Sequence, residues 1–357
     1  MNGSDAEAGT HYVTALQALT YGTVVLLAIV FAIGWRTEAL LEAWLVAFLV
    51  LAGLASASLG LLMIGHLLGE TWLHPVRCPL EAAASTTPLV LFLALPLAVG
   101  ADLLYPWAAG PIRGIAPERQ LYLSESFVLV RGAVILVLWI AIAIPILRRG
   151  RHQKASAIGL ALLAPTAAIF SIDWVGSREP VWWSSLFAFA YTVTQLAGAM
   201  ALALVVAMLQ QSYPDPARYH SLQRAAITLA LLTFWVWFAQ FLVVWMANLP
   251  AEVEWYLARS EGAWRWPMMA VALPSLLASI VLLLPSHPSR WRLVAAGLFL
   301  FVQYLAYMLW LVRPASAGMP ALTWADPPVW LGLALLWAIW YVAARRVAQA
   351  TIGQPPA

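Results

Sequence analysis

The strongest constraint on the fold is a series of long apolar stretches that recurs along the whole chain. Ten stretches come close to the roughly 20 residues that a helix needs to cross a bilayer. Because 63% of the residues are hydrophobic and only 10% are charged, a soluble core could not bury them all. The sequence therefore predicts an all-α integral membrane protein, a single polytopic domain over residues 1–357. The expected spans are about 12–34, 40–67, 84–105, 125–147, 155–175, 183–209, 222–248, 265–284, 291–312 and 328–344.

The basic residues predict the orientation of these spans. The densest basic cluster is "RRGRHQK", Arg148–Lys154, and basic loops of membrane proteins collect in the cytoplasm. If this loop is cytoplasmic, alternation places both termini there, together with eleven of the nineteen basic residues. We therefore interpret the basic residues as signals of orientation in the membrane. We expect membrane lipid to surround the chain, and we expect no nucleic-acid partner.

Metal and haem ligands are scarce in the sequence. Haem between membrane helices needs histidines that face each other, and only His66 of the six histidines lies inside an expected span. The single cysteine, Cys78, cannot supply an iron–sulfur ligand set. We expect this chain alone to bind no metal and no haem.

Three titratable residues, His66, Glu70 and His74, follow one another at steps of four near the end of the second expected span. That spacing would align them on one helix face at the cytoplasmic end. Two interpretations stay open: a cytoplasmic proton-entry site, because imidazole and carboxylate titrate in the required range, or a hydrated helix end with an internal ion pair. A zinc site would need a further element to close around the metal.

Arg131 and Asp102 lie in neighbouring expected spans, at a similar depth below the outer surface of the membrane. Arg131 lies about 10 Å below that surface by helix rise. We expect the two residues to form a buried ion pair, which either joins two helices or borders an outward-facing polar pocket.

The stretch "FSIDWVGSREPVWWSS" carries charges and indoles where the fifth span leaves the membrane. Tryptophan is an ordinary interfacial anchor, but that role does not explain an acid placed before the helix ends. One interpretation is an outer quinone and proton site that includes Asp173, Trp174 and Glu179. The structural alternative is that Asp173 caps or hydrogen-bonds the turn between the fifth and sixth spans, while Glu179 pairs with Arg178 or Arg259.

A second outer segment, "FAQFLVVWMANLPAEVEWYLARSEGAW", repeats the mixture of acids, arginine and aromatic residues at the end of the seventh span. Gln240 lies about 12 Å below the interface by helix rise. We expect these residues to complete the same site: Gln240, Asn248, Glu252, Tyr256 and Arg259.

These two segments, together with "GHLLGETWLHPVRCPLEAAASTTPLVLFLALPLAVGADLLYPWA", resemble a known family in the same order along the chain. They are similar to the second quinone-binding-type membrane subunit of alternative complex III, the bacterial quinol:cytochrome c oxidoreductase. That subunit is related to the NrfD-like membrane subunit of polysulfide reductase. The resemblance covers most of residues 13–312.

The resemblance implies ten helices with two four-helix bundles plus flanking helices, in a bacterial inner membrane. It also implies the partners, which are a multihaem cytochrome, an iron–sulfur subunit and a homologous membrane subunit. Haem and iron–sulfur centres would lie on those partners, while this chain would supply scaffold and quinone or proton contacts. Two other functions stay open: a secondary transporter or channel, and a stand-alone homologue that acts in assembly of the complex.

Overall fold

The computed structural model describes residues 3–69, 71–148, 152–210, 216–285, 287, 289–315, 320 and 322–352. Over these residues the chain is helical and contains no strand, and nine helices are long and apolar enough to cross a membrane. A shorter apolar helix, Leu19–Gly34, adds a tenth. The predicted all-α membrane fold is therefore confirmed.

The helices form two groups of four with two flanking helices. The first group contains α2 (Glu38–Leu68), the pair α3 (Leu73–Ala84) and α4 (Thr87–Val99), α8 (Glu125–Ile146) and α9 (Gln153–Trp174). The second contains α10 (Phe187–Gln210), α11 (Pro216–Ala247), α13 (Leu273–Leu283) and α14 (Arg290–Val312). Helix α2 packs against α10 and α14 and joins the two groups.

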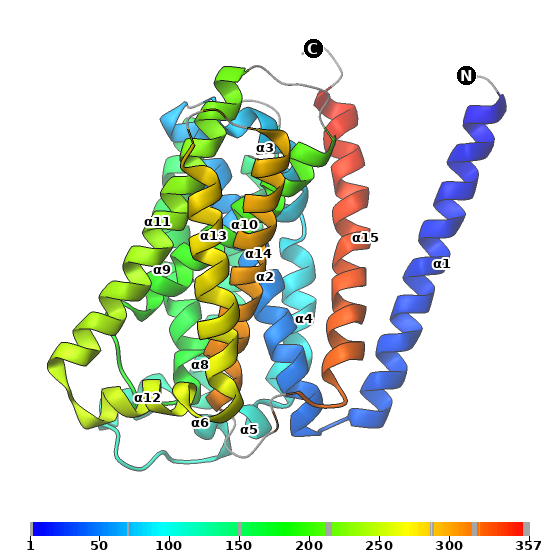
Figure 1. Ribbon diagram of the computed structural model, residues 1–357. Coiled ribbons are helices and arrows are strands. Elements are labelled where there is room, and N and C mark those ends of the chain that lie inside the picture. Colours follow the sequence, from blue (N-terminus) through cyan, green and yellow to red (C-terminus); the bar gives the residue numbers. More distant parts are fainter. Residues whose placement is uncertain are drawn as a thin grey trace.

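The flanking helices are α1 (Gly3–Gly34) and α15 (Asp326–Ile352). Helix α1 packs mainly against α15 and stands apart from the other helices (Figure 1). Its start and the end of α15 lie at the same end of the molecule (Figure 1). The sequence predicts ten crossings, and an even number of crossings likewise places both termini on the same side of the membrane.

The opposite end, which we call the far end, comprises residues 35–37, 100–124, 175–186 and 248–266. Short helices gather there: α5 (Ala101–Leu104), α6 (Pro106–Ala109), α7 (Pro117–Tyr122) and α12 (Pro250–Ser260). Short 3₁₀ turns occupy Gly176–Arg178, Gly262–Trp264 and Arg313–Ala315, and a π-helix, Pro267–Ala272, leads into α13.

The third crossing differs from its expected bounds of 84–105, because it spans Leu73–Val99. The expected span omits the polar start of this crossing, where Arg77 and Glu81 lie one turn apart on α3 and pair with each other at 2.7 Å. The crossing is bent between α3 and α4, where the hydroxyl of Thr86 bonds to the carbonyl of Ala83 at 2.6 Å. The indole of Trp337 on α15 donates to the same hydroxyl at 3.0 Å and holds the bend in place.

Candidate functional site

The charged residues in the last turn of α9 and in the segment that follows it each bind a different part of the molecule. Asp173, almost wholly buried, accepts two hydrogen bonds from the Arg131 guanidinium on α8, at 2.7 and 2.8 Å. The hydroxyl of Tyr122 donates to the same carboxylate at 3.0 Å. Arg131 also lies over the Tyr122 ring, 3.9 Å from its centroid. Asp173 therefore connects α9 to α7 through Tyr122 and to α8 through Arg131.

Arg178 and Glu179 also form ion pairs with residues on other helices, and these contacts reach the second group of helices. Arg178 pairs with the buried Glu42 at the start of α2 and donates to the carbonyl of Val312 at 3.0 Å. Glu179 pairs with Arg259 on α12. Of the interpretations open for this segment, pairing of Glu179 with Arg259 is the one that the structure contains, while Asp173 is an ion-pair partner and not a cap.

The predicted ion pair between Asp102 and Arg131 is wrong. Helix α4 ends at Val99, and the short helix α5 carries Asp102 to the surface, where it pairs with Arg36 in the turn before α2. Arg131 points toward α9 and binds Asp173 instead. Equal depth in the membrane did not identify the partner, because the rotation of α8 about its axis decides which neighbour the side chain meets.

The predicted alignment of His66, Glu70 and His74 on one helix is also wrong. Helix α2 ends at Leu68, and Gly69 adopts a left-handed conformation with φ of 68° that reverses the chain. His66 is buried, with its Nδ1 3.0 Å from the Ser156 hydroxyl on α9, whereas His74 is exposed on α3. Glu70 lies outside the described residues.

A large cavity lies between α11, α12, the π-helix and α14. Its volume is about 740 Å³. In Figure 1, α11 leans away from α13 toward the far end, and α12 crosses below the space between them. Eight of the nineteen residues in its walls are aromatic: Trp237 stacks on Tyr307 with centroids 4.4 Å apart, and Phe241 meets the ring of Tyr256 edge-on at 5.7 Å.

Four of the residues that the sequence singled out line this cavity, namely Gln240, Asn248, Tyr256 and Arg259. Glu179 reaches it indirectly, through its ion pair with Arg259. The remaining three do not line it. Glu252 is half-buried on α12, and Asp173 lies in the first group of helices. Trp174 packs on Phe48 of α2 at 4.8 Å, and its carbonyl accepts a hydrogen bond from Tyr105.

The charged group in the inner wall of the cavity is already engaged. The Arg259 guanidinium pairs with Glu179, donates to the carbonyls of Trp255 and Leu311, and stacks on the Trp255 ring at 3.7 Å. Burial lowers the pKa of Arg259 while Glu179 opposes that shift, and burial raises the pKa of the neighbouring Tyr256 hydroxyl. Arg259 stays cationic and Tyr256 stays neutral at physiological pH.

Sequence reasoning missed most of the residues that line the cavity, among them Trp237 on α11, and Tyr307 and Trp310 on α14. These three lie in the middle of apolar runs, where an aromatic residue gives no signal by itself. One signal was available, because Trp237, Gln240, Phe241, Val244 and Asn248 occupy positions i, i+3, i+4, i+7 and i+11 along α11. That stripe marks the cavity-facing side of the helix.

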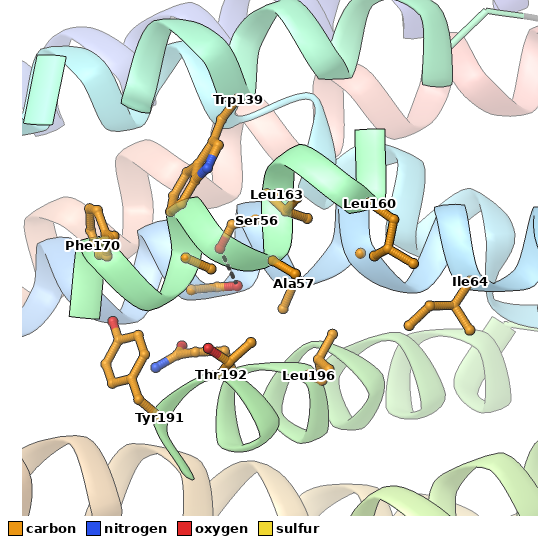
Figure 2. Close-up of a pocket in the computed structure, with 15 residues that line it drawn as sticks. Ser56, Ala57, Ile64, Trp139, Leu160, Leu163, Phe170, Tyr191, Thr192 and Leu196 are labelled. Atoms are coloured by element: carbon orange, nitrogen blue, oxygen red, sulfur yellow. Dashed lines mark hydrogen bonds between the residues drawn. The ribbon is translucent and has the colours of Figure 1, made fainter. Parts of the chain in front are cut away.

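A second, smaller cavity of about 110 Å³ lies between α2, α9 and α10 (Figure 2). Leu160 and Leu163 of α9, Ala57 of α2 and Leu196 of α10 give it an apolar lining. Near Gly53 the carboxamide of Gln195 accepts a hydrogen bond from Tyr304 at 2.5 Å and donates to the sulfur of Met308 at 3.2 Å.

The sequence matches no model of a known protein family and no curated protein sequence.

Proposed function

We propose that this chain is a membrane subunit of a respiratory quinol:cytochrome c oxidoreductase of the alternative complex III type. In this proposal it lies in a bacterial inner membrane with both termini in the cytoplasm. It contributes the helical scaffold and a quinol-binding cavity. The haem and iron–sulfur centres belong to a multihaem cytochrome and an iron–sulfur partner, beside a homologous membrane subunit.

The observation that carries the proposal is the cavity between α11 and α14. Its volume of about 740 Å³ lies within the range of roughly 300–1,000 Å³ that is usual for small-molecule sites. Aromatic side chains offer flat surfaces on which a quinone ring can stack. The exposed apolar side chains of Phe238, Phe241 and Met269 on the open side suit an isoprenoid tail that continues into lipid.

The chemistry of the lining also fits a subunit that binds quinol while its partners accept the electrons. Gln240, Tyr256 and Tyr307 provide hydrogen-bonding groups for ring oxygens. The lining residues, all within the described part of the chain, include no carboxylate and no histidine that could accept a proton directly. Proton release in the assembled complex would then use groups elsewhere.

Purification of the tagged chain under mild conditions tests the proposal. We expect haem-bearing and iron–sulfur subunits to co-purify, quinone to be extractable from the preparation, and the preparation to reduce cytochrome c with quinol. Purification in stoichiometric yield without any redox subunit, and without quinol:cytochrome c activity, would contradict the proposal.

Two aromatic residues on α11 form a matched pair for this test. Phe238 lines the cavity and Trp235 does not, although both are about half exposed, at 52% and 55%. Phe238→Ala is expected to lower the amount of quinone that stays bound, because it removes a ring from the wall. Trp235→Ala should leave bound quinone unchanged. Equal loss in both variants would mean that the quinone binds elsewhere.

A transporter remains the second candidate, and the bend between α3 and α4 favours it, because substrate sites of transporters are typically built on interrupted helices. A transported ion or solute would require polar groups at that bend. Its hydroxyls instead bond to backbone carbonyls of their own turn. Substrate-dependent flux in vesicles that contain only this chain would favour transport over the quinol function.

A further inference from the structure

The lining of the large cavity includes three neutral polar side chains from three different elements. They are Gln240 on α11, Tyr256 on α12 and Tyr307 on α14. Gln240 is 4% exposed and Tyr307 is 3% exposed. Among the described residues, neither the Gln240 carboxamide nor the two hydroxyls has a hydrogen-bond partner. Their polar atoms are not among the fully buried atoms that lack a partner, so they are open to the cavity and free to bind a ligand there.

Each of these three groups can both donate and accept a hydrogen bond. A carboxamide has an N–H donor and a carbonyl acceptor, and a tyrosine hydroxyl rotates to serve either role. A quinone oxygen only accepts, whereas a quinol hydroxyl also donates. Three bifunctional groups can therefore satisfy both forms of the ring without a change in their own protonation.

We infer that the cavity binds the oxidised and the reduced ring with similar affinity and exchanges no proton with either. This inference rests on the proposed quinol function and describes how the same site works. A cavity of this kind holds quinone and quinol next to a redox partner and does not itself favour one direction of the reaction.

The charged groups around the cavity support this inference. Arg259 is held by Glu179 and by two backbone carbonyls, so its charge is already balanced. Arg265 is exposed at the rim and stacks on Trp266 at 4.7 Å. Glu252 of α12 is half-buried outside the lining. None of the lining groups has an ordinary pKa between about 5 and 9.

Binding of decylubiquinone and of decylubiquinol to the purified full-length protein tests the inference. We expect the two dissociation constants to agree within about threefold, and each to change less than about twofold between pH 6 and pH 8.5. Calorimetry in two buffers of different ionisation enthalpy should show no net proton release. A preference above about tenfold for one form, or release of a proton on binding, would overturn the inference.

The variant Gln240→Leu keeps the size of the side chain and removes its donor and acceptor. It should weaken binding of both forms by a similar factor, at least about tenfold. Gln303→Leu is the control, because Gln303 is a buried glutamine on α14 outside the cavity, and it should leave both affinities unchanged. Weakening of only one form would also overturn the inference.

If Gln240→Leu does not accumulate, Tyr307→Phe replaces it, with the same expected weakening of both forms.

Two further results separate this inference from the proposed function. If the wild-type protein binds neither form, the inference and the quinol-binding role of the cavity fail, while co-purification with redox subunits still decides whether the chain is a subunit of such a complex. If both forms bind equally but no redox subunit co-purifies, the inference holds and the proposed function fails.

Discussion

Arg178 and Glu42 are 136 residues apart in the sequence, yet their side chains form an ion pair that is almost completely shielded from solvent. The second bond of this pair, from an Arg178 Nη to a Glu42 oxygen, measures 3.1 Å. It connects the segment after α9 to the central helix α2. Because Arg178 also bonds to the last carbonyl of α14, one guanidinium joins both groups of helices.

We expect Arg178→Met or Glu42→Leu alone to destabilise the protein by about 3–5 kcal/mol, because each change leaves the other charge buried without its partner. The double variant should recover a large part of that loss. The control is the exposed pair Arg36 and Asp102, whose side chains are 51% and 42% exposed and whose removal should cost about 1 kcal/mol or less. Unfolding in mixed detergent micelles measures both. Equal costs for the two pairs would contradict the structure.

The partner of Arg131 can be identified with double-mutant cycles. We expect Arg131→Ala and Asp173→Ala to show a coupling energy of about 0.5–3 kcal/mol, because the two residues are in direct contact. Arg131→Ala and Asp102→Ala should be additive. Coupling to Asp102 without coupling to Asp173 would restore the pairing predicted from the sequence.

The stability of the far end should depend on pH in the alkaline range. Burial, followed by the charge of Asp173, raises the pKa of Tyr122 from 10.0 to about 12. The folded protein keeps this proton where the unfolded chain loses it, so the stabilisation is complete below pH 10 and is lost as the pH rises through 12. Thermal unfolding of wild type and Tyr122→Phe from pH 8 to 12 measures this effect. The wild type should lose stability more steeply, and parallel curves would contradict the assignment.

Gly53 on α2 leaves no room for a side chain beside Gln195 of α10, next to the smaller cavity. A Cβ atom at this position would lie 1.6 Å from Oε1 of Gln195, which is held by Tyr304. Gly53→Ala should therefore cost about 1–3 kcal/mol. Gly22→Ala on α1 is the control, because a Cβ there meets nothing within 4 Å, and it should be neutral or slightly stabilising. A neutral Gly53→Ala would show that Gln195 moves freely.

The two ends of the molecule should be labelled from opposite sides of the membrane. Lys154 lies in the first turn of α9, near the end that carries the termini, and Glu254 is exposed on α12 at the far end. In a Cys78→Ser background, Lys154→Cys should react only from the cytoplasmic side and Glu254→Cys only from the outside of intact cells. Reaction of both from one side would contradict the ten-crossing topology, and an exchange of the two sides would invert the proposed orientation.

The helices could be predicted because the bilayer requires long apolar runs, and the bounds of α2, α8, α9 and α14 fall within a few residues of the expected spans. The third crossing was misplaced because Arg77 and Glu81 neutralise each other on one face of α3, which lets a charged segment remain helical. Helix α2 ends before Gly69 because the backbone of this glycine adopts a left-handed conformation. Its left-handed conformation was not foreseen, so His66 and His74 were placed on one helix.

The site was predicted less completely, because its geometry depends on contacts between distant segments. Gln240 and Arg259 were identified since polar residues in an apolar context are unusual. Tyr307 is an aromatic residue on a helix rich in them, and only the three-dimensional position of α14 brings it to the cavity. Asp173 was singled out as an acid placed before the end of a span, but its ion-pair partner depended on the rotation of α8.

The lean of α11 links the cavity to the membrane itself. This helix has 32 residues and is therefore about 48 Å long, well above the roughly 30 Å of a hydrocarbon core. A long helix accommodates a thinner bilayer by tilting further and a thicker one by standing more upright. Because α11 alone forms one wall of the cavity, its tilt sets the width of the opening. Acyl-chain length and sterol-like thickening agents should therefore change how readily a ligand enters, without any contact between those lipids and the residues that bind it.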